Sequence, residues 1–187
     1  MCKLKEKRQR VLSMHIFLTI ISFIAVWVRR DYRNWERMYP TMQYIALGNL
    51  TYNFLCAAHW LWRMSPDIDW YNFTLLEMGY TFVVFPATAL MFLSRYPEGA
   101  GFWRIIRHYL CWIGIYVGFE YIMQAQGTIV YKYGWSLGWS AIFDCIMFPF
   151  LRMHLKKPLL TFLLSIPMAL FWLWLFDIPT HIPIEKR

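Results

Sequence analysis

The chain alternates between long apolar segments and short polar connections. Six segments are long enough to cross a hydrocarbon layer of about 30 Å. They lie at residues 11–28, 40–62, 71–94, 105–123, 135–151 and 158–176. Helices are expected, because an isolated strand would leave backbone groups unpaired in lipid and no barrel-like alternation is visible. The pattern predicts an all-α integral membrane protein with a single domain over residues 1–187.

The basic residues between these segments bear on how many of them cross. If all six cross, the Lys and Arg residues divide 9 against 10 between the two sides, which carries no orientation signal. If residues 11–28 do not cross, the division becomes 15 against 4, a strong positive-inside bias. The segment also carries a narrow polar stripe at helical spacing, typical of an interfacial helix. The stripe consists of Arg8, His15, Thr19, Ser22, Arg29 and Arg33.

We therefore expect a bundle of five transmembrane helices (40–62, 71–94, 105–123, 135–151 and 158–176) plus a basic amphipathic helix in residues 1–39. The bias puts the N-terminus in the cytoplasm and the C-terminus outside. No small-x-small cleavage site follows the first apolar run, so we expect that run to be retained. The alternative is six transmembrane helices, with the polar stripe turned into the bundle.

Composition agrees with a membrane protein. Apolar residues make up 59% of the chain and charged residues 16%, and 11 tryptophans contribute to an aromatic share of 20%. A soluble domain of this size has too little interior to bury that much apolar surface. The net charge of +8 lies between apolar runs, so anionic lipid headgroups are expected as its partners, and nucleic acid is not. The four cysteines have no metal-type spacing, and we expect neither a metal site nor a cofactor.

Ionisable residues inside membrane segments are costly and are functional candidates by default. Four of the predicted segments each carry one stripe of polar side chains, as expected of helices around a polar interior. The residues that we expect to converge on an outward-facing pocket are His59, Arg63, Glu77, Glu120, Asp144, Asn49, Asn53 and Ser140. The alternative is that the same groups form interhelical polar clamps.

Basic side chains gather at the inner ends of the predicted helices, where they could hold anionic headgroups. They are Arg95, Arg104, Arg107, Arg152, Lys156 and Lys157. The alternative is a plain positive-inside signal without bound lipid.

Catalytic motifs have little support. Residues 134–138 match the GxSxG pattern, but a nucleophile elbow requires a strand before it, and here the pattern begins a predicted membrane helix. We therefore name no catalytic residue and favour a non-enzymatic protein.

Several short strings resemble a family of small uncharacterised polytopic membrane proteins of endospore-forming Firmicutes, such as bacilli and clostridia. The strings are Arg29-Arg30-Asp31, Tyr39-Pro40-Thr41-Met42, Gly48-Asn49-Leu50, Tyr52-Asn53-Phe54, Phe85-Pro86-Ala87-Thr88, Leu93-Ser94-Arg95-Tyr96-Pro97, Gly138-Trp139-Ser140, Met147-Phe148-Pro149, Leu151-Arg152 and His154. The resemblance covers most of the chain and implies a bacterial cytoplasmic membrane or a spore membrane. It carries no catalytic residue over.

Three functions follow as hypotheses. The first is a membrane protein that binds or passes a small polar or cationic solute, or a proton, through the polar pocket. The second is a structural or assembly subunit of a membrane complex, with a protein partner or as a homo-oligomer and with a role in sporulation. The third is a lipid-modifying membrane enzyme.

Overall fold

The fold is mainly helical. The computed structural model describes residues 2–66 and 72–187, and 76% of the structure is helix. Counting α3, η2 and α4 as one continuous helix, these residues form six helices and one pair of short strands. The elements are α1 (Cys2–Val28), η1 (Asp31–Asn34), α2 (Trp35–Leu55), β1 (Trp62–Met64), α3 (Phe73–Gly79), η2 (Tyr80–Val84), α4 (Phe85–Ser94), α5 (Phe102–Gln126), β2 (Ile129–Tyr131), α6 (Leu137–Lys156), α7 (Pro158–Leu175) and η3 (Ile184–Lys186).

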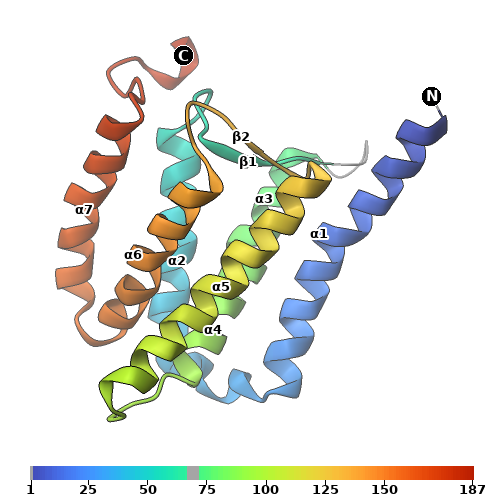
Figure 1. The fold of residues 1–187 in the computed structure, drawn as a ribbon. Helices are drawn as coiled ribbons and strands as arrows, with labels where there is room; N and C mark the ends of the chain where they lie inside the picture. The colour runs from blue at the N-terminus through green and yellow to red at the C-terminus, as the bar shows by residue number, and fades with distance from the viewer. Residues whose placement is uncertain (1, 67–71) are drawn as a thin grey trace.

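The helices run back and forth between two ends of a bundle (Figure 1). Both termini and the β1–β2 pair lie at one end, which we call the strand end. The other end carries the α1–α2 turn, the α4–α5 connection and the α6–α7 junction, and we call it the basic end. The side chains that the sequence assigns to lipid headgroups all fall at the basic end.

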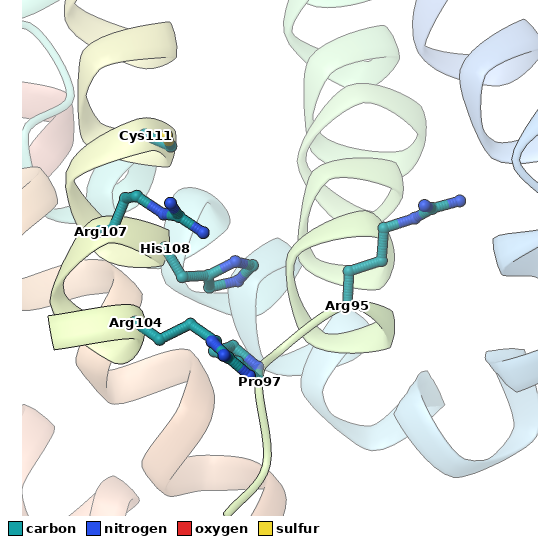
Figure 2. A pocket seen from close by; sticks show the side chains of 6 residues that line it. All are labelled: Arg95, Pro97, Arg104, Arg107, His108 and Cys111. Atoms are coloured by element: carbon teal, nitrogen blue, oxygen red, sulfur yellow. The ribbon is translucent and has the colours of Figure 1, made fainter. Parts of the chain in front are cut away.

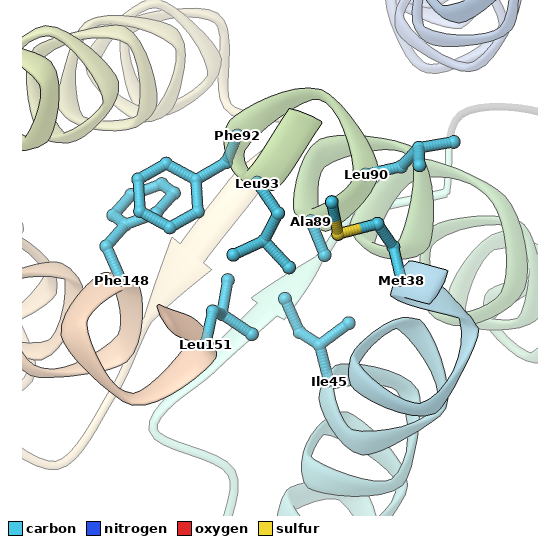
Figure 3. Close-up of a cluster of buried hydrophobic side chains, with 8 residues drawn as sticks. All are labelled: Met38, Ile45, Ala89, Leu90, Phe92, Leu93, Phe148 and Leu151. Carbon is cyan, nitrogen blue, oxygen red and sulfur yellow. The ribbon is translucent and has the colours of Figure 1, made fainter. Parts of the chain in front are cut away.

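The hydrophobic core centres on α4, in which every residue from Pro86 to Leu93 is buried. Figure 3 shows its main cluster, in which side chains of α4 meet those of α2 and α6. Phe92 of α4 and Phe148 of α6 are fully buried, with ring centroids 5.0 Å apart. Helix α4 is therefore the element against which α2 and α6 pack.

The helix from Phe73 to Ser94 contains a wide π-type turn at η2. Pro86 follows within the first turn of α4. Proline has no N–H to donate, and its ring crowds the carbonyl of the preceding turn, so the helix widens there without breaking.

The strands are a feature that the hydropathy pattern does not predict. The segment expected to be helical over 40–62 ends as a helix at Leu55, and Ala58 adopts a left-handed conformation. The chain then enters β1, which pairs antiparallel with β2. The Tyr52 hydroxyl stabilises this turn, because it accepts hydrogen bonds from the backbone N–H groups of Leu61 and Trp62.

The expected N-terminal helix over 1–39 is divided in the structure. Helix α1 ends at Val28, and Arg30 adopts a left-handed conformation before η1 and α2. Buried Asp31 holds this turn through ion pairs with Arg29 at 3.2 Å and Arg95 at 3.3 Å.

Helix α1 packs lengthwise along η2 and α4 and does not lie across the end of the bundle (Figure 1). Near the strand end, His15 is buried and its Nδ1 is hydrogen-bonded to the Tyr80 hydroxyl at 2.8 Å. The hydroxyls of Thr19 and Ser22 donate to carbonyls of their own helix. His15 therefore faces the bundle, and Thr19 and Ser22 are half-buried beside it.

Two helical stretches of the described residues are long and apolar enough to cross a membrane, Phe73–Ser94 and Pro158–Leu175. They differ in burial, since 61% of the first and only 11% of the second is buried. The apolar stretch Met14–Val28 is shorter.

Candidate functional site

The expected single pocket is divided between two carboxyl-centred sites and an aromatic cap in the structure. The first, which we call the Glu77 site, consists of Asn49, Asn53, Glu77 and Thr81. The second, which we call the Glu120 site, consists of Glu120, Tyr131, Ser140 and Asp144. His59 and Arg63 lie in the cap at the strand end.

The Glu77 site joins α2 to the α3–η2 segment. Buried Glu77 accepts hydrogen bonds through Oε2 from the side-chain amides of Asn49 at 3.4 Å and Asn53 at 3.2 Å. The Asn49 amide also donates to the Thr81 hydroxyl at 2.7 Å. Asn49 and Asn53 are four residues apart on α2, as Glu77 and Thr81 are on the opposing helix, so each pair shares one face.

Arg63 interacts with Glu77 only electrostatically. Its guanidinium lies over the Phe73 ring, 3.6 Å from the centroid, and His59 stacks on Tyr133 with centroids 3.5 Å apart. Both residues therefore belong to a cation–aromatic cap over the strand end, outside either carboxyl site.

The Glu120 site joins α5, β2 and α6. Oε1 of Glu120 accepts hydrogen bonds from the hydroxyls of Tyr131 at 2.6 Å and Ser140 at 2.5 Å. The Ser140 hydroxyl in turn accepts from the Trp135 indole N–H at 2.9 Å. Burial, together with the hydrogen bond to Glu120, raises the pKa of the Tyr131 hydroxyl, so that hydroxyl stays a donor.

Asp144 lies one helical turn beyond Ser140 on α6 and is 4% exposed. Its Oδ2 has no hydrogen-bond partner among the described residues, and the Glu120 carboxylate acts on it electrostatically. The Tyr116 hydroxyl, one turn from Glu120 on α5, also lies near Asp144. The two acids, on α5 and α6, thus lie close enough to interact electrostatically, and neutral hydroxyl groups lie beside them.

The two acids differ in their hydrogen bonding. Glu120 accepts bonds from two hydroxyl groups, whereas Oδ2 of Asp144 has no partner among the described residues. One proton held by the pair would avoid a second buried negative charge beside the first.

The two sites are separated by an aromatic wall at the strand end. Tyr52 and Trp62 stack with centroids 4.9 Å apart and an interplanar angle of 5°. Trp62 of β1 is the register partner of Tyr131 on β2. The strand pair therefore positions the Tyr131 hydroxyl beside Glu120, and its Trp62 packs against Tyr52 near the end of α2.

Tyr131 is a site residue that the sequence reasoning missed. Hydropathy placed it in a connection, but the run Thr128-Ile129-Val130-Tyr131 is rich in β-branched and aromatic residues, which is a strand signal. Alternation along such a strand predicts that Ile129 and Tyr131 share one face, and Ile129 is buried.

The six basic residues expected to bind headgroups have different surroundings. Arg152 forms an ion pair with Glu98, and Lys156 lies 3.6 Å from the same carboxylate. Arg104 and Arg107 have no ion pair with any acidic side chain in the described part of the chain. A pocket of about 260 Å³ opens beside them, and Figure 2 shows its lining residues, which are Arg95, Pro97, Arg104, Arg107, His108 and Cys111.

Within residues 2–66 and 72–187, no group of three or more His, Cys, Asp and Glu side chains is placed to hold a metal ion. Comparison of the chain with protein-family models, curated proteins and solved structures gives no match. The geometry of the two sites is therefore the basis for a functional conclusion.

Proposed function

We propose that the chain is a multi-pass protein of a bacterial cytoplasmic membrane that binds a proton or a small monovalent cation at the Glu120–Asp144 pair. It works without a cofactor and catalyses no covalent reaction. The resemblance to membrane proteins of endospore-forming Firmicutes is kept as part of this proposal.

The distribution of polarity on α1 supports the membrane setting. The helix buries His15, half-buries Thr19 and Ser22, and exposes an apolar face. The exposed apolar residues are Phe17, Ile20, Ile21, Phe23, Ile24, Trp27 and Val28. A helix on the surface of a water-soluble protein has the opposite arrangement, with its apolar face against the core. An exposed apolar face of this extent requires lipid or another protein to cover it.

Helix α7 supports the same setting. Nine of its 18 residues are large hydrophobic side chains exposed at the surface, including Leu159 and Trp174 at its two ends. In water this face would be a severe aggregation hazard, whereas in lipid it is in its preferred solvent.

Six crossing helices fit this arrangement better than five. Helix α1 packs lengthwise against η2 and α4, and His15 bonds Tyr80 between them. At 1.5 Å per residue its 27 residues extend about 40 Å, which exceeds the hydrocarbon thickness of about 30 Å. Helices α2, α5 and α6 each contribute polar residues to the carboxyl sites, which lowers the mean hydropathy of these helices.

The observation that carries the ligand proposal is the uncompensated Glu120–Asp144 pair. Neither acid has an ion pair with a basic side chain of the described residues, and one Asp144 oxygen has no hydrogen-bond partner there. Two negative charges buried side by side without a cation would cost several kcal/mol. Occupation by one proton, or by a monovalent cation in its place, removes that cost.

The Glu77 site supports a different role for its carboxyl group. Two amides satisfy Glu77, and they tie α2 to α3, which is how membrane helices use polar side chains as interhelical links. We therefore assign a structural role to Glu77, and this is the observation that favours the second candidate function, a structural subunit.

Infrared difference spectroscopy of the purified protein tests the proposal. Raising the pH, or adding Na⁺ or K⁺ at fixed pH, is expected to remove the absorption band of one protonated carboxyl group. Asp144→Asn should abolish that band. Glu36→Gln, which changes an exposed carboxylate on α2, is the matched control and should leave it intact.

A band that persists in Asp144→Asn, or that responds to neither pH nor cations, would contradict the proposal. If the variants instead lost a co-purifying protein chain while the spectrum stayed unchanged, the structural-subunit function would replace it.

A further inference from the structure

We propose that the pocket beside Arg104 and Arg107 binds the phosphate group of an anion, supplied either by a lipid headgroup or by free phosphate. The site is at the basic end of the bundle, and it is independent of the proton or cation proposed for Glu120 and Asp144. Of the six basic residues at this end, Arg104 and Arg107 are the two that both line the pocket and have no ion pair within the described residues.

The charges around the pocket are not balanced within the described residues. Asp31 is engaged by Arg29 and Arg95, and Glu98 is engaged by Arg152 and Lys156. Arg104 and Arg107 lie three residues apart on one face of α5, where two like charges repel each other. A bound anion would relieve that repulsion.

The directions of the side chains separate the binding residues from the pocket wall. In Figure 2 the Arg95 guanidinium turns away from Arg104 and Arg107, toward the side on which it bonds Asp31 and the Arg29 carbonyl. His108 is held in the wall, because its Nε2 hydrogen-bonds to the carbonyl oxygen of Phe92 at 3.1 Å. The two guanidinium groups of α5 are therefore the ligand-binding groups.

The chemistry of these groups suits phosphate. A guanidinium presents several N–H donors in a planar fork that matches phosphate oxygens, and it is always charged. Helix α5 also begins at Phe102, so its N-terminus points to this end and contributes partial positive charge. The volume of about 260 Å³ is below the roughly 300 Å³ at which pockets for drug-sized ligands begin, and it suits a compact group.

The residues at the start of α5 indicate that the pocket lies at the level of a membrane surface. Phe102 and Trp103, at the start of α5, are 66% and 80% exposed. The indole of Trp103 favours the headgroup layer, which is where lipid phosphates lie. The same guanidinium pair can also bind phosphate from solution, so the experiment has an arm for each source.

Native mass spectrometry of the purified full-length chain tests the site. The chain is titrated separately with dioctanoyl phosphatidylglycerol, dioctanoyl phosphatidylcholine and inorganic phosphate. The variant Arg104→Gln/Arg107→Gln removes the pair. Arg33→Gln/Arg37→Gln removes the same charge from exposed positions at the same end and is the matched control. Circular dichroism establishes that both variants are folded.

We expect the parent and the control to bind one equivalent of phosphatidylglycerol more tightly than phosphatidylcholine, and the pocket variant to lose about 10- to 30-fold in affinity, as removal of two basic contacts predicts. Saturable binding of inorganic phosphate that is lost in the pocket variant, without a preference among the lipids, assigns the site to free phosphate and also supports the proposal. Equal losses in the two variants would reduce the effect to general surface charge and overturn it. Absence of saturable binding of any probe to the parent would overturn it as well.

Discussion

The hydrogen bond from Tyr131 to Glu120 provides a measure of the charge on that carboxyl group. The substitution Tyr131→Phe removes one donor and little volume. If Glu120 is the ionised member of the Glu120–Asp144 pair, as we propose from its two hydroxyl donors, losing this bond should cost about 1.5–3 kcal/mol of unfolding free energy. A bond between neutral groups in a membrane protein is worth only about 0.6 kcal/mol on average.

A double-mutant cycle isolates the contribution of the charge. In a Glu120→Gln background the acceptor stays in place but is neutral, so Tyr131→Phe should cost about 0.6 kcal/mol there. The difference predicts a coupling of about 1–2 kcal/mol between the two substitutions. The assay is equilibrium unfolding in mixed detergent micelles, followed by circular dichroism.

The chain contains a matched neutral pair for comparison. Tyr44 on α2 and Ser165 on α7 are joined through their hydroxyls at 2.7 Å. Tyr44→Phe should cost about 0.6 kcal/mol, with similar coupling to Ser165→Ala. If Tyr131→Phe costs the same with Glu120 and with Gln at that position, within about 0.5 kcal/mol, the assignment of charge to Glu120 is refuted.

Three further predictions use the same unfolding assay. Asp31→Asn removes a buried carboxylate that holds the α1–α2 turn through Arg95. Because its partners are half exposed, we expect the free energy of unfolding to fall by about 1–2 kcal/mol. An unchanged free energy of unfolding would contradict that role. Phe148→Ala opens a cavity in the core and should cost about 3–5 kcal/mol, whereas Leu163→Ala on the exposed face of α7 should stay within about 0.5 kcal/mol; equal costs would contradict the assigned core. The pKa of the Tyr131 hydroxyl is raised in the folded protein, so its contribution to the free energy of unfolding is complete below the unfolded pKa of about 10 and is lost as the pH rises above that value. Tyr131→Phe should therefore flatten the decline in stability above about pH 10. A decline that is unchanged in the variant would contradict this.

Hydropathy predicts the bounds of a helix well where the segment is almost entirely apolar. The segments at 71–94 and 158–176 agree closely with Phe73–Ser94 and Pro158–Leu175. The length of the helix after Trp35 is less predictable, because Tyr52 ends it through bonds to backbone groups nine and ten residues further along the chain. Periodicity within one helix contains no information about such a contact.

The candidate site shows the same limit. Spacing along single helices places Asn49 with Asn53, and Ser140 with Asp144, on common faces, as the structure has them. Spacing does not determine which helices are neighbours. The residues expected in one pocket are therefore divided between the Glu77 site and the Glu120 site in the structure. Arg63 and His59 lie apart from both because their segment leaves the helix and stacks on aromatic rings.

The polar stripe on residues 11–28 shows what a charge count leaves open. Counting Lys and Arg favoured an interfacial helix, but the count does not register that His15 can bond Tyr80 inside the bundle. A polar stripe is compatible with either environment. Only the packing partner distinguishes an inward face from one that lies on a membrane surface.

Site-directed thiol labelling in cells tests the central claim, a bundle of six crossing helices, most directly. Two variants each carry one cysteine, Cys2 in the first and Arg104→Cys in the second, with every other cysteine replaced. A membrane-impermeant maleimide is added to intact cells and then to lysed cells. The account predicts that the chain sediments with membranes and that only one of the two positions is labelled in intact cells, because α1 separates the strand end from the basic end. Labelling or protection of both positions together, or recovery of the chain in the soluble fraction, would contradict it.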